Sequence, residues 1–194
     1  MKLPNQNIVM DRLVDFIKVY DDALDCNVCD CLVEFFERSE DIQQKVENNR
    51  KPNFTQINLT ENISISKDLE DIHQNIIQTV FRYKRLYYEF VYDECFPKSH
   101  AFEQFRVKRY NPNFNEAFDT HVDVTDYESS RRFLSFLFYL NNVEVGGNTT
   151  FKDLDITPKK GRLVVFPPLW MFPHYGEDPI SNSKYILSTY LHYK

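Results

Sequence analysis

The sequence has little glycine and cysteine, and it lacks a long apolar run. Its 194 residues include only 4 Gly, 4 Cys and 1 Trp. No apolar stretch approaches the roughly 18–20 residues that a membrane-crossing helix needs. The first residues, MKLPNQNIVMDRL, have neither the apolar segment nor the small-residue cleavage site of a secretion signal. We therefore expect a soluble, intracellular protein that does not engage a membrane.

Basic side chains are also in deficit. Lys and Arg total 23 against 29 Asp and Glu, which gives a formal net charge of −6. A protein that binds nucleic acid over a broad surface normally carries an excess of basic residues on one face. We therefore do not expect nucleic acid to be the partner of this chain, although a local basic groove is not excluded.

The four cysteines do not form a zinc-binding pattern. Cys26, Cys29 and Cys31 cluster in CNVCDC, whereas Cys95 stands alone. A closed structural zinc site needs four ligands, usually supplied as two pairs. We therefore expect free thiols near the start of a helix, whose role the sequence does not reveal.

Apolar and aromatic side chains are abundant. Hydrophobic residues make up 42% of the chain and aromatic residues 15%. This length and composition predict a single domain over residues 1–194 with a full hydrophobic core. Residues 1–100 are typical of mainly helical support, and residues 101–194 are typical of a core built from strands.

Two helices are predicted in the first half. One is expected to begin after Asp25 and the other after Ser66, because each of these N-cap residue types precedes apolar residues at helical spacing. His73 lies beside the second stripe and is expected to be packed there. Short strands are expected at 16–21 and 53–59, with a polar loop before Pro52. The apolar stripes comprise Val28, Leu32, Phe35 and Phe36, and then Leu69, Ile72, Ile76, Val80, Tyr83, Tyr87 and Phe90.

The second half reads as a series of strands. β-branched and aromatic residues between turn signals predict strands at 104–110, 132–141, 161–166 and 184–193. All four glycines lie in this half, and Gly146, Gly147 and Gly161 are expected to supply positive φ in tight connections. Strands of this number and spacing predict two packed antiparallel sheets, a jelly roll, flanked by helices.

The pair His121 and Asp123 is the first chemical signal. If its segment ends in a strand, side chains two residues apart point to the same face. An imidazole and a carboxylate would then lie side by side. Two His and one carboxylate with open positions suit non-haem Fe(II). The third ligand must come from further along the chain, where His174 lies in FPPLWMFPHYGEDP.

Further motifs follow in a fixed order. GGNTTF and TPKKG lie between Asp123 and His174, and Lys184 follows His174 by ten residues. In this order of motifs, from about Phe102 to Tyr193, the sequence resembles the prolyl-4-hydroxylase-like branch of the Fe(II)/2-oxoglutarate-dependent oxygenases. The resemblance implies a double-stranded β-helix as the catalytic core, with N-terminal helices that support its major sheet.

The resemblance also implies a set of site residues. His121, Asp123 and His174 would hold Fe(II), with O2 as the oxidant and ascorbate to sustain activity. Lys184 would pair with the distal carboxylate of the co-substrate 2-oxoglutarate. Other contacts with the co-substrate would come from Tyr110, Tyr139, Ser188 and Ser135.

Strand parity supports this placement independently. Ser135 and Tyr139 fall on one face of their strand, opposite a face of Leu and Phe residues. In the last strand, Lys184 and Ser188 likewise share a face. A buried ammonium group without an anion is costly, so a dicarboxylate bound at Lys184 would explain this pattern. A surface Lys on an edge strand is the alternative.

Three positions depart from the family pattern. Phe118 stands three residues before the first ligand, where Tyr is common and would add a hydroxyl. Ser183 precedes Lys184, where Gly is frequent, and Tyr190 stands where Trp is common. None of these positions belongs to the ligand triad.

The substrate is less constrained than the chemistry. The resemblance implies hydroxylation of a C–H bond, with a prolyl residue of a peptide or protein as the expected substrate. Arg132 would then help to hold the peptide and Trp170 would border the entrance, although a solvated charge and a packing role are the respective alternatives. A free amino acid, another small molecule or a nucleobase stays open as the substrate, as do a zinc hydrolase and a metal-free β-sandwich interaction module. Oligomeric state is not revealed.

Overall fold

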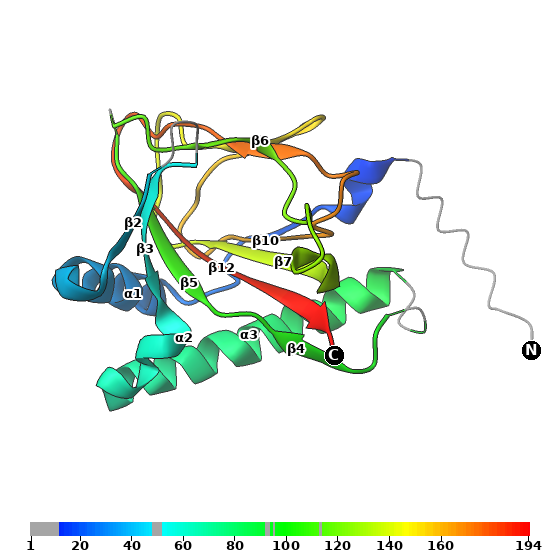
Figure 1. Cartoon of the computed structure of the whole chain (residues 1–194), viewed down its shortest axis with the longest axis horizontal. Helices are drawn as coiled ribbons and strands as arrows, with labels where there is room; N and C mark the ends of the chain where they lie inside the picture. Colours follow the sequence, from blue (N-terminus) through cyan, green and yellow to red (C-terminus); the bar gives the residue numbers. More distant parts are fainter. Residues whose placement is uncertain (1–11, 48–51, 92–93, 95, 113) are drawn as a thin grey trace, which may run out of the picture.

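The chain forms two antiparallel sheets that face each other, with helices against the outer face of the larger sheet (Figure 1). The computed structural model describes residues 12–47, 52–91, 94, 96–112 and 114–194. The larger sheet has the strand order β1-β10-β7-β12-β5-β3-β2, with β4 also paired to β12, and the smaller sheet has the order β6-β11-β8-β9. The strands are β1 (Lys18–Tyr20), β2 (Gln44–Val46), β3 (Phe54–Asn58), β4 (His100–Phe102), β5 (Arg106–Tyr110), β6 (Phe118–His121), β7 (Arg132–Tyr139), β8 (Thr149–Phe151), β9 (Leu154–Ile156), β10 (Leu163–Phe166), β11 (His174–Gly176) and β12 (Lys184–Tyr193).

Both predicted helices begin at their predicted caps. The carboxylate of Asp25 accepts a hydrogen bond from the Asn27 backbone N–H at 2.7 Å, and α1 (Cys26–Arg38) follows. The hydroxyl of Ser66 accepts one from the Leu69 N–H at 3.1 Å before α3 (Lys67–Val91). The structure also has a short helix, α2 (Leu59–Asn62), and 3₁₀ turns at Leu13–Phe16, Glu40–Ile42, Ile63–Ile65 and Ser129–Arg131. None of the helices in this described part of the chain combines the length and the apolar character that a bilayer crossing requires.

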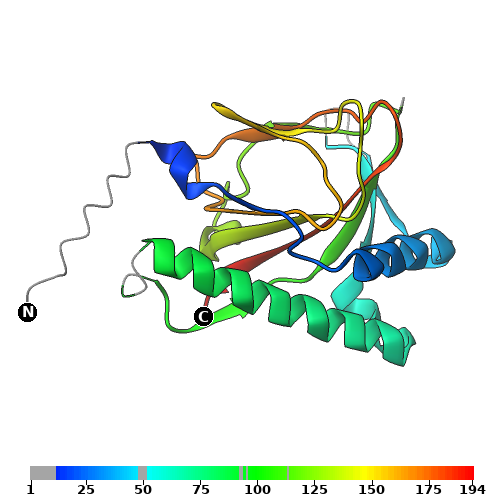
Figure 2. The ribbon, with the colours of Figure 1, turned by 180° about the vertical axis from the view of Figure 1, so that it is seen from behind.

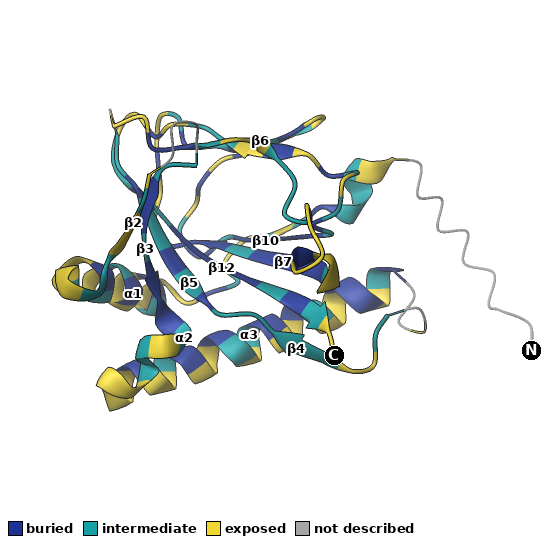
Figure 3. Cartoon of the chain, in the orientation of Figure 1, coloured by how far each residue is buried: buried dark blue, intermediate teal, exposed yellow. Residues whose placement is uncertain are grey.

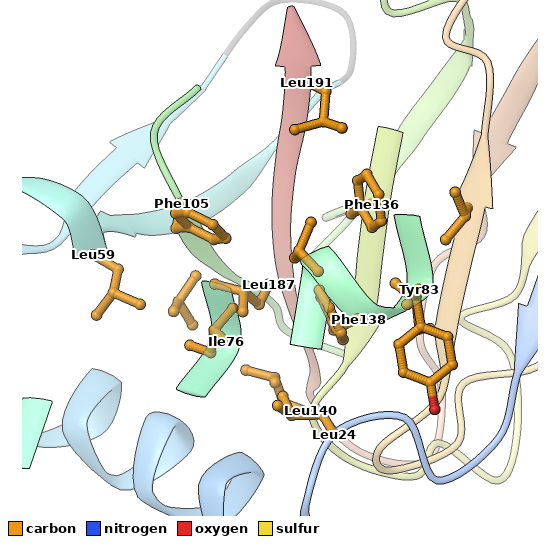
Figure 4. Close-up of a cluster of buried hydrophobic side chains, with 14 of the residues drawn as sticks. Leu24, Leu59, Ile76, Tyr83, Phe105, Phe136, Phe138, Leu140, Leu187 and Leu191 are labelled. Carbon is orange, nitrogen blue, oxygen red and sulfur yellow. The ribbon is translucent and has the colours of Figure 1, made fainter. Parts of the chain in front are cut away.

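The apolar stripes of α1 and α3 pack on the larger sheet. Figure 2 shows α3 lying across the back of this sheet, with α1 beside it. Leu32 and Phe36 of α1 and Ile76 of α3 are fully buried there. The sheet contributes the face that strand parity predicts for packing, Leu134, Phe136, Phe138 and Leu140, together with Leu187 and Leu191 of β12. Figure 4 shows Phe136, Phe138, Leu140, Leu187 and Leu191 in this cluster.

The opposite face of the larger sheet turns toward the smaller sheet. A second apolar cluster lies between them and includes Tyr139, Val164, Phe166 and Ile186. The central strands β7, β10 and β12 are therefore covered on both faces, as the mostly buried colouring of these strands in Figure 3 shows. This arrangement leaves the space between the sheets for a site.

Several short elements differ from the sequence-based expectation. The segment 44–46 was expected to be loop but forms β2, and the predicted strand at 16–21 begins only at Lys18 because Phe16 ends a 3₁₀ turn. Residues 1–100 thus contribute strands to the larger sheet as well as helices. The smaller sheet consists of strands of three or four residues, of which only the segment before Asp123 was anticipated.

Other local predictions are confirmed. Gly146 and Gly147 have φ of +74° and Gly161 has φ of +78°. A Cβ on Gly146 would lie 2.5 Å from the Asp178 carbonyl oxygen, so this turn requires glycine. His73 is buried and packs edge-on against Phe105 with ring centroids 5.1 Å apart. Cys26, Cys29 and Cys31 are free thiols, and Cys95 lies outside the described residues.

Candidate active site

His121 and His174 are brought together by the pairing of β6 with β11. They are direct register partners in this antiparallel pair, although they are far apart in sequence. Asp123 lies two residues beyond the last residue of β6, so the strand ends earlier than the sequence interpretation assumed. Its carboxylate nevertheless lies 3.7 Å from Nε2 of His121 and 3.9 Å from Nε2 of His174. One ligand atom from each residue lies within 4.8 Å of the other two.

Backbone carbonyls fix the tautomer of both imidazoles. Nδ1 of His121 lies 2.7 Å from the carbonyl oxygen of Asp119, and Nδ1 of His174 lies 3.1 Å from that of Phe172. A carbonyl oxygen only accepts, so each Nδ1 carries the proton as donor. Each Nε2 is then left with a lone pair on the side of Asp123. This is the arrangement in which metal-bound imidazoles are commonly held.

The carboxylate of Asp123 has one satisfied and one unsatisfied oxygen. Oδ1 accepts a hydrogen bond from the Tyr190 hydroxyl at 2.8 Å. Oδ2 is buried and has no hydrogen-bond partner among the described residues. Buried polar atoms normally have a partner, so an orphaned oxygen beside two free imidazole nitrogens fits a bound cation.

Electrostatics favour the protonation states that a metal needs. Burial would raise the pKa of Asp123, but the two neighbouring histidines and the hydrogen bond from Tyr190 lower it overall. Burial lowers the pKa of His174, which keeps the imidazole neutral. An ionised carboxylate beside two imidazole nitrogens whose lone pairs are free is a ligand set that suits non-haem Fe(II).

Aromatic rings surround the two imidazoles. Phe118 stacks on His121 with centroids 3.7 Å apart, and Phe151 and Phe166 lie 5.1 and 5.0 Å from His174. Phe118 is one of the positions that depart from the family pattern. It lacks a hydroxyl but still orients the imidazole by stacking.

A cavity of about 480 Å³ extends from the triad between the two sheets. Its floor is the inward face of the larger sheet and its roof comes from β6 and β11. Of the residues expected to contact a co-substrate, Tyr110, Ser135, Lys184 and Ser188 line it. Tyr110 is buried, and burial followed by the charge of Asp123 raises the pKa of its phenol.

Lys184 is a buried cation that has no carboxylate partner among the described residues. Lys184 is only 4% exposed, and its ammonium donates a hydrogen bond to the carbonyl oxygen of Gly147. No carboxylate of the described chain lies within ion-pair distance of it. Burial lowers its pKa from 10.5 to about 7, against a smaller opposing influence from Glu177. Such a group is positioned to bind an anion in the cavity.

Tyr139 was expected to contact the co-substrate, but it lies beneath the cavity rather than on its wall. Its hydroxyl donates to Oγ1 of Thr149 at 2.7 Å, and Thr149 lines the cavity in its place. Sequence reasoning assigned no role to Thr149. The signal was present, because this residue belongs to GGNTTF.

Arg132 lines the cavity but is engaged by the protein. Its guanidinium makes two hydrogen bonds to the Glu103 carboxylate, at 2.7 and 2.9 Å, and donates to the backbone carbonyl of Asp123 at 2.7 Å. The guanidinium carbon lies 4.2 Å from the centroid of the Tyr190 ring. Arg132 therefore braces Asp123 and Tyr190 and is not the solvated charge that was the alternative, while its role in holding a peptide stays a prediction.

Trp170 does not lie at the entrance of this cavity. It is 77% exposed and belongs to a separate surface hollow with Leu13, Val14 and Met171. Two cavity residues that sequence reasoning did not assign are Arg106 and Lys108. Strand parity could have identified them, because they alternate with Tyr110 along β5.

Comparison with known proteins agrees with this geometry. Residues 105–192 match the family described as the 2OG-Fe(II) oxygenase superfamily. A segment of 60 residues, 28% of this chain, is 45% identical to a probable prolyl 4-hydroxylase 9 of Arabidopsis thaliana. The aligned part spans only 20% of that protein's length.

Two solved structures illustrate the likeness of fold. A viral collagen prolyl hydroxylase of Paramecium Bursaria Chlorella virus-1, in complex with 2OG, has a TM-score of 0.67 at 18% identity over 92% of this chain and 96% of that chain. A prolyl hydroxylase of Trichoplax adhaerens, in complex with a hypoxia inducible factor oxygen degradation domain peptide fragment, has a TM-score of 0.71 at 15% identity over 91% and 83% of the two chains. The predicted double-stranded β-helix is confirmed by these matches. Residues 105–192 of this chain, which contain the His-Asp-His cluster suited to iron, are thus similar to the 2OG-Fe(II) oxygenase superfamily, and the fold is that of the prolyl hydroxylases compared above.

Proposed function

We propose that this protein is an Fe(II)- and 2-oxoglutarate-dependent dioxygenase that hydroxylates a prolyl residue of a peptide or protein. The observation that carries the proposal is that one cavity is lined both by the triad and by Lys184. Lys184 is buried and has no carboxylate partner among the described residues. A metal site alone would suit many reactions. A metal site combined with a buried anion site suits a reaction that needs a carboxylate co-substrate.

The triad residues would hold the iron, and the residues around them would keep them in place. The carbonyls of Asp119 and Phe172 orient the imidazoles, and the Tyr190 hydroxyl leaves Oδ2 of Asp123 free to bind. When bound, iron with 2-oxoglutarate and O2 supplies the oxidation of a C–H bond, with succinate and CO2 as co-products. The protein's part is binding, orientation and the exclusion of water.

Lys184 would hold the far carboxylate of 2-oxoglutarate. Its ammonium is already oriented by the Gly147 carbonyl, and an arriving carboxylate would supply the missing counter-charge. Tyr110, Ser135 and Ser188 offer hydroxyls on the same wall. The Tyr139 hydroxyl orients Thr149, so Tyr139 would act on the co-substrate only through that residue.

The prolyl substrate is supported by the matching proteins, which are prolyl hydroxylases from several sources. One of them was solved with a peptide fragment. The cavity has a volume of about 480 Å³ and its lining includes the triad, so a side chain of a peptide could bind in it beside these residues.

The test is an assay of purified protein with Fe(II), 2-oxoglutarate and ascorbate, which keeps the iron reduced. Succinate formation is measured with and without a panel of proline-containing peptides, and the peptides are then examined for a mass gain of one oxygen. We expect stimulation and oxygen incorporation on a proline ring, both lost in His174→Ala. Absence of succinate under all conditions would refute the oxygenase assignment. Oxygen incorporation into a free amino acid or nucleobase, but into no peptide, would refute the substrate class alone.

A further inference from the structure

The cavity holds more positive charge than the proposed reaction uses. Its charged lining residues are Arg106, Lys108, Asp123, Arg132, Glu177 and Lys184. Arg132 is neutralised by Glu103, which lies outside the lining, and Lys184 is assigned to the co-substrate. Arg106 and Lys108 have no such partner in the proposed reaction, although the chain as a whole has a net charge of −6.

These two cations lie side by side on the cavity floor. Both belong to β5, where alternation places Arg106, Lys108 and Tyr110 on one face. In the pairing of β5 with β12, Tyr110 lies opposite Lys184. Lys108 lies opposite Ile186, and Arg106 lies opposite Ser188. Lys108 therefore lies one same-face step, roughly 7 Å along the strand, beyond the row that contains Lys184. The charges of Arg106 and Lys108 are therefore separate from the charge of Lys184.

Neither cation is neutralised by a carboxylate in the part of the chain that the structure describes. Arg106 donates to the side-chain oxygen of Gln104, which is uncharged, and the Lys108 ammonium lies 5.2 Å from the centroid of the Phe54 ring. No carboxylate of the described residues lies within ion-pair distance of either side chain. Burial lowers the pKa of Lys108 from 10.5 to about 8. The negative charge of Asp123 opposes this shift, and the positive charges of Arg106 and Arg132 add to it.

Two adjacent like charges in a partly buried cavity destabilise the fold unless a ligand offsets them. Surface lysines avoid this cost by extending into water, whereas Lys108 points into the cavity near the metal triad. The charge of Asp123 acts on Lys108, and that of Lys108 acts on His174, so the three groups are close enough to interact. An anion bound at Lys108 would therefore lie beside the reacting centre and on the floor of the substrate space.

We propose that Arg106 and Lys108 form a carboxylate subsite for the substrate, so that the hydroxylated residue lies next to a carboxylate group. This inference rests on the proposed function and specifies its substrate. The carboxylate belongs either to an Asp or Glu side chain adjacent to the target proline or to the α-carboxylate at a peptide's C-terminus. Both sources present the same planar, bidentate anion, which suits an Arg and a Lys placed together.

Peptides that differ in a single charge test the subsite. The set contains one sequence with Asp, Asn or Lys beside the proline, each as C-terminal amide, and the Asn peptide also as C-terminal free acid. Binding is measured by calorimetry under argon with Fe(II) and 2-oxoglutarate, where no turnover occurs, and kcat/KM is measured in air. A charge-assisted hydrogen bond corresponds to about a 10–100-fold preference for a carboxylate over its amide.

Variants assign the preference to the subsite. We expect Lys108→Met to lose most of the preference for the acidic peptide, Lys108→Arg to keep it, and Lys108→Glu to favour the Lys peptide. Lys45→Met is the matched control, because Lys45 lies on β2 of the same sheet, exposed and paired with Glu47, and outside this cavity. It should behave as the wild type. Thermal melting of every variant shows which of them are folded.

The outcomes separate the two proposals. Equal binding of acid and amide peptides by the wild-type protein would overturn the subsite, as would an acid preference that survives in folded Lys108→Met and Lys108→Glu. A fall in 2-oxoglutarate affinity in Lys108→Met, with the acid preference of the peptides retained, would assign Lys108 to the co-substrate and also overturn it. Failure of the wild-type protein to form succinate would refute the proposed function. The calorimetric comparison of the acidic peptides with the amide peptides would still test the subsite, because it does not depend on turnover.

Discussion

Replacing Lys184 with methionine would remove a buried charge while keeping most of the side chain's volume. The structure predicts opposite effects of this change on stability and on co-substrate binding. The pKa of Lys184 falls from 10.5 to about 7 on folding, because burial disfavours the ammonium form. Below pH 7 both folded and unfolded states carry the charge, so the full penalty applies.

The magnitude follows from this difference in pKa. At 1.36 kcal/mol per unit, burial of the charge costs roughly 4 kcal/mol near pH 7. Methionine leaves the Gly147 carbonyl without its donor, which costs about 1–2 kcal/mol. We therefore expect Lys184→Met to be more stable than the wild type by about 2 kcal/mol at pH 7. The difference should shrink as pH rises toward 10.5, because in that window the unfolded state binds the extra proton and the wild type gains stability.

Binding of 2-oxoglutarate should change in the other direction. Loss of one charge-assisted hydrogen bond, about 1.5–3 kcal/mol, weakens affinity roughly 10–150-fold. Urea unfolding between pH 6.5 and 10 measures the stability, and calorimetry with Fe(II) under argon measures the affinity. The reasoning would be refuted by a variant that binds 2-oxoglutarate like the wild type. It would equally be refuted by a loss of stability that does not depend on pH, since Lys184 would then be a structural residue.

Three further predictions address the metal, its support and the scaffold. His174→Ala should abolish succinate formation while the metal-free protein still unfolds cooperatively, because apolar packing holds the sheets together; normal turnover in this variant would exclude the triad. Arg132→Met should weaken Fe(II) binding about 10–100-fold, as expected when a ligand loses its support, and a higher KM for peptide at unchanged iron affinity would instead return Arg132 to substrate binding. Ser66→Ala should lower stability by about 1 kcal/mol, seen as a fall in Tm of about 2–4 °C, with kcat unchanged, and an unaltered Tm would show that the cap is dispensable.

Helices and long strands were predictable because their signals are local. Asp25 and Ser66 identify the starts of α1 and α3, and alternation in β7 and β12 separates the packing face from the cavity face. Strands of three residues, such as β2 and β11, carry too little alternation to be recognised. They form because a partner strand supplies their hydrogen bonds, and that partner is set by the tertiary fold.

The clustering of the three triad residues was predictable for a different reason. The order of motifs along the chain resembles a family pattern, and this pattern identifies His121, Asp123 and His174 without any knowledge of where strands end. The local assumption behind the first pair was wrong in detail, since β6 stops at His121. The two side chains still meet because the turn after β6 directs Asp123 back toward the histidines, held by the bond from Arg132 to its carbonyl.

The cations of the cavity show where sequence reasoning ends. Strand parity can place Lys108 and Lys184 on inward faces, but it cannot say which cation has a carboxylate within reach. Glu103 lies 2.7 Å from Arg132 although they are 29 residues apart, and this contact neutralises Arg132 where it supports the backbone of Asp123. Lys108 has no such neighbour among the described residues, so its charge is available to a ligand. The distance to the nearest acid, which only the fold determines, is what distinguishes a structural cation from a binding one.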